Sequence, residues 1–368
     1  MEEFPNTQFQ GSLIQKETSK KIFISVLVLV LIFLGGLTGV LASKIWDPLW
    51  NPFRPEPEEV IERMALEMEK VKTSQGKTEL SLIASNEGKF ELKLNSEGKI
   101  DKSQPEKSQY GSSFNLIVSV TEKGESMGMK FALPGELKII DETGYIKLTT
   151  LPAVPFLGML GIDLSQIEDQ WIKIDQESMI EFMKEMVGEN WTPEMERTYK
   201  KSTEKQKVIQ KELQEKMRKV LMKKKLCLVK EELPDEKING KKVYHYLVAL
   251  NQEELLTATP EIWKLMEEVM SKEYGIAPNL EEKEFKEKSK EILDKIGEIG
   301  GEIWIGKKDY LLYRIKGEKS IDLSKFEEKG RILISLNLEN SKFNQPVKIK
   351  APSEYKTLDE ILAPLFVW

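Results

Sequence analysis

The sequence predicts an α+β protein, with one membrane-spanning helix near its N-terminus and an extracytoplasmic domain built on an antiparallel sheet. Three observations predict this class. An uncharged apolar run begins at Ile22 and ends at Ser43, segments of alternating polar and apolar residues begin at Leu80, and segments with helical spacing lie before and after those strands. Neighbouring strands joined by short turns favour an antiparallel meander over a parallel α/β sheet.

The apolar run is predicted to cross the membrane once. Its 22 residues would form a helix roughly 33 Å long, enough for a bilayer core of about 30 Å, whereas a cleavable signal peptide has an apolar region of about 7–15 residues. We therefore expect the anchor to be retained. Cleavage after Ala42 is the alternative, because Val40 to Ala42 fits a small-residue cleavage pattern.

The residues on either side of this run predict its orientation. Lys16, Lys20 and Lys21 precede it, so residues 1–21 are expected in the cytoplasm and the bulk of the chain outside the plasma membrane. Residues 44–57 contain four prolines and predict a stiff stalk. Three aromatic residues in this stalk are expected at the membrane interface: Trp46, Trp50 and Phe53.

Residues 58–368 are predicted to form one domain, because no long linker divides them. A helix is expected to start at Pro57, and Thr192 and Pro193 are expected to begin a helical insertion over 192–225. The other predicted helices cover 176–187, 260–274 and 280–296. Strands are predicted around 80–84, 90–94, 114–120, 127–133, 137–139, 146–148, 171–175, 226–229, 243–250, 303–305, 310–315, 332–338 and 347–349, with Asn239-Gly240 as a hairpin turn.

The composition excludes several functional classes. With 40% hydrophobic and 32% charged residues the domain is ordinary and globular, and its single cysteine, Cys227, cannot form an internal disulfide. No cluster of cysteines and histidines predicts a metal or redox site, so no metal or cofactor is expected. A net charge of −6 argues against a nucleic-acid partner, which selects for a basic face.

No motif predicts an enzyme. The run from Gly301 to Lys307 matches a phosphate-binding loop until Lys308 takes the place of the magnesium-binding Ser or Thr, and its interior is expected to be a strand. His245 is the only histidine and lies in a predicted strand, so a structural role is expected for it. We expect no catalytic residue; a hydrolase with an unrecognised pair of carboxylates is the remaining alternative.

An uncharged stretch over residues 151–162 interrupts both periodicities. Such a stretch packs into the core, covers a cavity or touches the membrane. Methionine is also frequent in the first half of the domain, and its flexible side chain adapts to irregular apolar ligands, although plain core filling is the alternative for each one. The residues predicted to line or cover a ligand cavity are Leu151, Val154, Phe156, Leu157, Met159, Leu160, Met127, Met129, Phe131 and Phe114.

The order of elements resembles the bacterial lipoprotein carriers (LolA-like) and the related LppX and LprG lipid-binding lipoproteins. The resemblance lies in the opening helix, the strand meander and three short stretches, at 163–175, 240–246 and 303–308. It implies a curved half-barrel whose concave side is covered by helices around an apolar cavity, and it implies no catalytic residue. This chain departs from the family in its protein anchor and in the long insertion over 192–225.

The resemblance and the residues together predict a membrane-anchored, non-enzymatic binding protein. Its expected partner is a membrane lipid or the acyl chains of an acylated protein; no protein partner can be named from the sequence. The alternative is a structural or protein-interaction module of the cell envelope, which would have a filled core and no ligand.

Overall fold

The computed structural model of the chain describes residues 55–86, 88–104, 107–121, 129–151, 167–274 and 281–361. These residues form one sheet and several helices, which is the predicted α+β class. The predicted membrane helix, its cytoplasmic tail and the stalk as far as residue 54 lie outside them, as do Trp46, Trp50 and Phe53. Among the helices that the structure describes, none has both the length and the apolar content needed to cross a bilayer.

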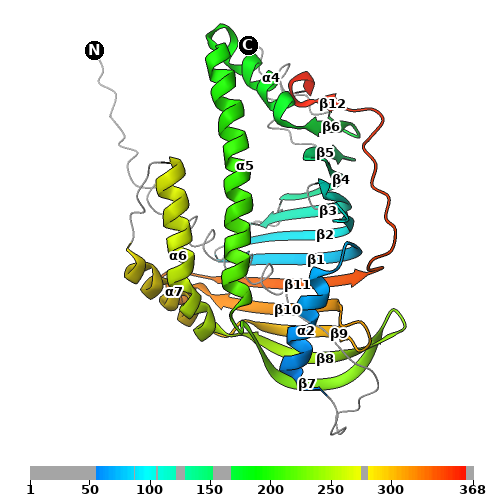
Figure 1. The fold of residues 1–368 in the computed structure, drawn as a ribbon, viewed down its shortest axis with the longest axis vertical. Coiled ribbons are helices and arrows are strands. Elements are labelled where there is room, and N and C mark those ends of the chain that lie inside the picture. Colours follow the sequence, from blue (N-terminus) through cyan, green and yellow to red (C-terminus); the bar gives the residue numbers. More distant parts are fainter. Residues whose placement is uncertain are drawn as a thin grey trace, which may run out of the picture.

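The twelve described strands lie in one sheet, in the order β12-β6-β5-β4-β3-β2-β1-β11-β10-β9-β8-β7 (Figure 1). Neighbouring strands are antiparallel, except that β12 and β6 are parallel. The strands are β1 (Thr73–Ser85), β2 (Lys89–Asp101), β3 (Gln109–Thr121), β4 (Met129–Ile140), β5 (Thr143–Leu148), β6 (Trp171–Ile174), β7 (Cys227–Ile238), β8 (Lys241–Leu250), β9 (Gly300–Gly306), β10 (Leu312–Asp322), β11 (Arg331–Ser341) and β12 (Lys356–Thr357).

Two meanders make up this sheet, and β11 joins them. Strands β1 to β6 form the first meander and β7 to β10 the second, each in consecutive order. Strand β11 comes late in the chain but lies between β1 and β10, where Leu336 pairs with Leu80. Pairing between the two ends of the domain therefore holds the sheet together.

The helices lie beside the sheet, and α5 runs along the direction in which the strands are stacked (Figure 1). Thr192 caps α5 as predicted, because its hydroxyl oxygen accepts a hydrogen bond from the Met195 N–H at 3.2 Å, and Pro193 takes the first helical position. The α-helices are α2 (Pro57–Glu69), α4 (Gln176–Val187), α5 (Pro193–Met222), α6 (Gln252–Tyr274) and α7 (Glu282–Ile296), with short 3-10 turns η3 (Gly188–Asn190) and η4 (Leu323–Phe326).

The predicted hairpin between β7 and β8 is confirmed. Asn239 and Gly240 have φ angles of 51° and 79°, the left-handed conformation that a two-residue hairpin turn requires at both positions. The false phosphate-loop motif is also confirmed as strand and turn, since β9 ends at Gly306 and a turn follows it.

Four predicted boundaries are wrong. Two strands were predicted between 127 and 139, but the described residues of this range lie in one strand, because β4 runs without interruption from Met129 to Ile140. Helix α6 begins at Gln252 and contains Pro260, which was predicted to start it. The insertion expected over 192–225 contains one continuous helix of 30 residues, α5, which ends at Met222, three residues before the predicted end. Residues 347–349 form no strand, and β12 follows instead at Lys356–Thr357.

The buried core lies under the second meander. Helix α2 packs Val60, Ile61 and Met64 onto side chains of β8, β9 and β10, and none of these three helix residues is more than 6% exposed. The strand residues of this cluster are Tyr244, Tyr246, Val248, Ile303, Ile305, Leu312 and Ile315, together with Tyr310 from the turn before β10. The space between α2 and this half of the sheet is therefore filled with side chains.

Candidate functional site

The register of the first meander places a continuous group of apolar side chains on one face of β1 to β4. Paired residues of antiparallel strands point to the same side, so each aligned row continues across the strands. One such row is Leu82, Leu92, Val118 and Phe131. We call twelve members of this group the open apolar face: Leu80, Leu82, Phe90, Leu92, Leu94, Phe114, Leu116, Val118, Val120, Met129, Phe131 and Leu133.

The opposite face of the same strands is mostly polar, with Ile83 and Ile117 among its few apolar members. In β2 the side chains that alternate with the apolar ones are Lys89, Glu91, Lys93 and Asn95. Such alternation is the usual pattern of an antiparallel sheet with one solvated side. The open apolar face is thus the side of the sheet that a protein would normally bury.

This face is not buried. No hydrophobic side chain of β1 to β4 belongs to the buried set of the described residues, whereas β8, β9 and β10 contribute most of the buried hydrophobic side chains that lie in strands. Met129 is 62% exposed, and the other eleven members are partly exposed. Leu80 and Leu82 pack against the cluster that Ile296 of α7 forms with β10 and β11, whereas the members on β2 to β4 belong to none of the buried clusters. The covered part of the face therefore ends at β1, and β2 to β4 keep a partly exposed apolar surface.

Helix α5 lies on the same side of the sheet as this face. Helix α2 packs against Leu336, which pairs with Leu80 of the face, so α2 is on that side. Helix α5 is joined to α2 by an ion pair between Arg218 and Glu69. Helix α5 therefore lies next to α2, but none of its residues belongs to the buried core clusters.

Charged contacts, and not burial, hold α5 in place. None of its residues is buried, although Tyr199, Ile209, Leu213, Met217 and Val220 repeat along one side of the helix and are partly covered. Besides the pair with Glu69, ion pairs join Glu196 to Lys184 of α4 (3.2 Å), Lys207 to Glu142 in the β4–β5 turn (2.5 Å) and Lys216 to Glu268 of α6 (3.3 Å). Exposed pairs of this kind contribute about 0–1 kcal/mol each.

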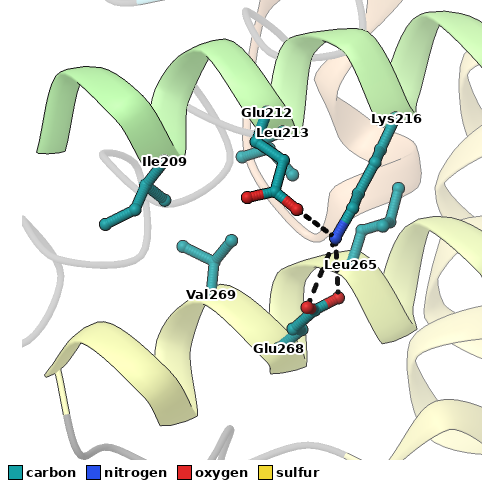
Figure 2. A pocket seen from close by; sticks show the side chains of 7 residues that line it. All are labelled: Ile209, Glu212, Leu213, Lys216, Leu265, Glu268 and Val269. Carbon is teal, nitrogen blue, oxygen red and sulfur yellow. Dashed lines mark hydrogen bonds and ion pairs between the residues drawn. The ribbon is translucent and has the colours of Figure 1, made fainter. Parts of the chain in front are cut away.

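A small pocket lies between α5 and α6 (Figure 2). Its volume is about 80 Å³, and the Lys216 ammonium lies in it between Glu212 at 2.8 Å and Glu268 at 3.3 Å. Pockets for small molecules usually measure about 300–1,000 Å³. This pocket is too small and too charged for an acyl chain, and we interpret it as part of the contact between the two helices.

Three of the predicted cavity residues lie on the open apolar face. Phe131 pairs with Val118 and Met129 with Val120, and Phe114 pairs with Gly135, whose missing side chain leaves room for the Phe114 ring. Leu151 follows β5 and is partly buried. The other predicted cavity residues lie outside the described residues: Met127, Val154, Phe156, Leu157, Met159 and Leu160.

The leucines of β1 and β2 were not predicted as site residues, although their alternation was recognised. Their alternation predicts the strands around 80–84 and 90–94, but it does not show which strand faces the helices leave exposed. The signal that could have identified them is the scarcity of amphipathic helices in this half of the chain: only the helix that starts at Pro57 precedes the meander.

The groups considered for catalysis contact neighbouring side chains of the sheet. The His245 ring stacks on Trp304 with 4.3 Å between ring centroids, and its two nitrogens contact Glu302 at 2.8 Å and Glu236 at 3.1 Å. Lys307 is buried beside Asp235 and lies over the Tyr244 ring. Among the described residues, no three acidic, histidine or cysteine side chains come together in a way that could hold a metal ion.

The thiol of Cys227 is expected to be unreactive. Burial, helped by the nearby Glu58 carboxylate, raises the pKa of this thiol to about 12. Because the thiolate is the reactive form, modification by a disulfide reagent at pH 8 should be at least about a hundredfold slower in the native protein than in urea. Rates within a few-fold of each other would show that this end of β7 opens readily.

Comparisons with known proteins returned solved structures only. No protein-family model matches the chain, and no curated protein matches it. The lipoprotein LppX of Mycobacterium tuberculosis is 11% identical, with a TM-score of 0.24 over 78% of this chain and 94% of that one. An outer membrane lipoprotein-sorting protein domain from Vibrio parahaemolyticus is 10% identical, with a TM-score of 0.15 over 74% and 87%.

A third solved structure is a DUF1329 family protein from Desulfovibrio piger. It is 9% identical, with a TM-score of 0.19 over 78% of this chain and 92% of that one. The resemblance stated from the sequence and the structural comparison thus name the same proteins: this chain is similar to LppX and to a lipoprotein-sorting domain.

Proposed function

We propose that this protein is a non-enzymatic binding protein that holds a lipid, or the acyl chains of an acylated protein, on the open apolar face. One observation carries the proposal: ten apolar side chains on β2, β3 and β4 remain partly exposed and belong to none of the buried clusters of the described residues, while helices α2 and α7 pack on the rest of the same face, Leu80 and Leu82 included. Large exposed apolar surfaces on globular proteins usually mark a binding site.

The energetics of burial favour an acyl chain as the ligand. Each CH₂ group removed from water contributes about 0.8 kcal/mol, so contact with part of one chain gives useful affinity. The face has no charged member, and its aromatic and methionine side chains, Phe114, Phe131 and Met129, adapt to a flexible chain. We also propose that the run from Ile22 to Ser43 anchors the protein in the plasma membrane, with the binding domain on the outer side.

The second candidate is a structural or interaction module of the envelope. It is favoured by the filled half of the sheet, where α2 packs on β8 to β10 with little exposed apolar area. The two candidates differ in the role of β1 to β4. A module without a ligand would need this face covered by a protein partner, whereas a lipid-binding protein needs it free.

Binding of radiolabelled palmitate to the detergent-purified full chain tests the proposal. The paired substitution Leu92→Asn and Val118→Asn, on neighbouring strands of the face, should weaken binding by about tenfold or more, because each change removes about 1.5–3 kcal/mol of apolar contact. Ile83→Asn on the other face of β1 is the matched control and should change affinity less than about twofold. Equal binding by all three proteins would contradict the proposal.

A further inference from the structure

The charges of this protein are distributed unevenly, and α5 carries an excess of cations. The whole chain has 55 basic and 61 acidic residues, for a net charge of −6. Residues 193–225, which comprise α5 and the three lysines after it, contain twelve Lys and Arg residues against five Glu. A strongly basic helix is thus displayed on an otherwise acidic protein, and none of its residues is buried.

Several of these cations are not neutralised within the protein. Among the described residues, Arg197, Lys201, Lys223 and Lys225 are exposed and have no carboxylate partner. Their charge is therefore available to a partner. Arg197 and Lys201 lie in α5, and Lys223 and Lys225 lie just after its last residue; we call these four residues the free cations of α5.

Exposed apolar side chains accompany the cations. Val208 is 66% exposed and Met222 is 37% exposed. At 100° per residue they lie on the same side of α5 as Arg197, Lys201 and Lys219, and away from the partly covered stripe that includes Leu213. Glu204 and Glu215 lie on this side too, and Glu215 is paired with Lys219 at 2.9 Å. The outer side of α5 therefore combines a small excess of positive charge with accessible apolar groups.

We propose that the outer side of α5 docks on the surface of an anionic lipid bilayer. Helices that lie in a membrane interface combine Lys and Arg with apolar side chains, and each cation near an anionic surface strengthens binding about fivefold. A nucleic acid would instead favour aromatic side chains between the cations. The one aromatic residue within α5, Tyr199, lies on its other side. The inference holds whether or not the open apolar face binds an acyl chain.

Proteoliposomes containing the full chain test this inference. An environment-sensitive fluorophore is attached at Val208→Cys in a Cys227→Ser background, and its quenching by spin-labelled lipid is measured. We expect strong quenching with 30 mol% phosphatidylglycerol and little with phosphatidylcholine alone. In 1 M salt, where the Debye length is about 3 Å, the quenching with phosphatidylglycerol should fall to the phosphatidylcholine level.

Matched charge variants identify the residues responsible. Replacing the four free cations of α5 with glutamine should weaken association by on the order of a hundredfold or more and remove the quenching. The control replaces four other exposed lysines that have no ion-pair partner among the described residues and should leave the quenching unchanged. These are Lys99, Lys107, Lys348 and Lys350.

Neither variant loses an ion pair, so both are expected to unfold at the same temperature as the unchanged protein. Thermal unfolding measures this and verifies that both are folded. Quenching that does not depend on anionic lipid, or that both variants lose equally, would overturn the proposal. So would an unquenched fluorophore in every vesicle, which would assign the basic side of α5 to an acidic partner in solution.

Discussion

Replacing Leu312 with alanine is expected to lower the free energy of unfolding by about 2–5 kcal/mol. Leu312 is 0% exposed and lies in the cluster between α2 and the second meander. Truncation there leaves a cavity that well-packed neighbours fill only in part. Chemical denaturation followed by circular dichroism measures the loss.

The matched change on the open apolar face is Leu92→Ala. It removes the same atoms, but from a partly exposed position where no enclosed cavity is left, so a loss under about 1 kcal/mol is expected. Equal losses at Leu312 and Leu92 would show that the first meander is packed as tightly as the second. The conclusion that the second meander is packed and the first is partly open would then be wrong.

Gly301→Val is expected to destabilise the fold by about 3 kcal/mol or more. A Cβ atom at Gly301 would lie 2.4 Å from the backbone oxygen of Lys316 and 3.1 Å from the Cα of Gly317 on the neighbouring strand. Neither is a flexible side-chain end that could move aside, so the pairing of β9 with β10 must distort. Thermal unfolding of the variant measures this effect.

Gly144→Ala is the control for this substitution. Gly144 also lies in a strand, but its nearest neighbour would be 3.5 Å from the added Cβ, which is ordinary contact. A change within about 1 kcal/mol is expected, because the strand conformation suits alanine. A similar cost at both glycines would mean that close approach between β9 and β10 is not what requires Gly301.

Local patterns predicted the elements that depend on near neighbours in the sequence. The alternation in β1 to β3, the hairpin at Asn239-Gly240 and the cap at Thr192 are all confirmed, because turn chemistry and side-chain period determine each within a few residues. The position of β11 between β1 and β10 could not be predicted in this way. It depends on pairing between strands about 250 residues apart.

The errors in α6 and at residues 347–349 have different physical causes. Pro260 removes a backbone donor, yet buried Leu255, Ala258 and Ile262 continue one apolar stripe across it, and their packing keeps α6 continuous. Near Val347 the alternation is real but no neighbouring strand pairs with it. Ile349 instead packs beside Gly111 of β3, outside any ladder.

The sequence predicted some residues of the candidate site, but not how many strands contribute to it. Phe114, Met129 and Phe131 were identified from their chemistry, and the register brings them together. Leu92 and Leu94 of β2 join them because α5 lies beside this part of the sheet without burying it, whereas Leu80 and Leu82 of β1 pack against the cluster that contains Ile296 of α7. Coverage of a face depends on how distant elements pack, and no single strand sequence contains that information.

Photocrosslinking of the full chain with a diazirine-labelled fatty acid tests the central claim most directly. Peptide-resolved mass spectrometry should place the crosslinks on β1 to β4, within residues 80–94 and 114–133, and on the partly covered side of α5. Crosslinks confined to β8 to β10, or absent from β1 to β4 at saturating fatty acid, would contradict the assignment of the open apolar face as the acyl-binding site.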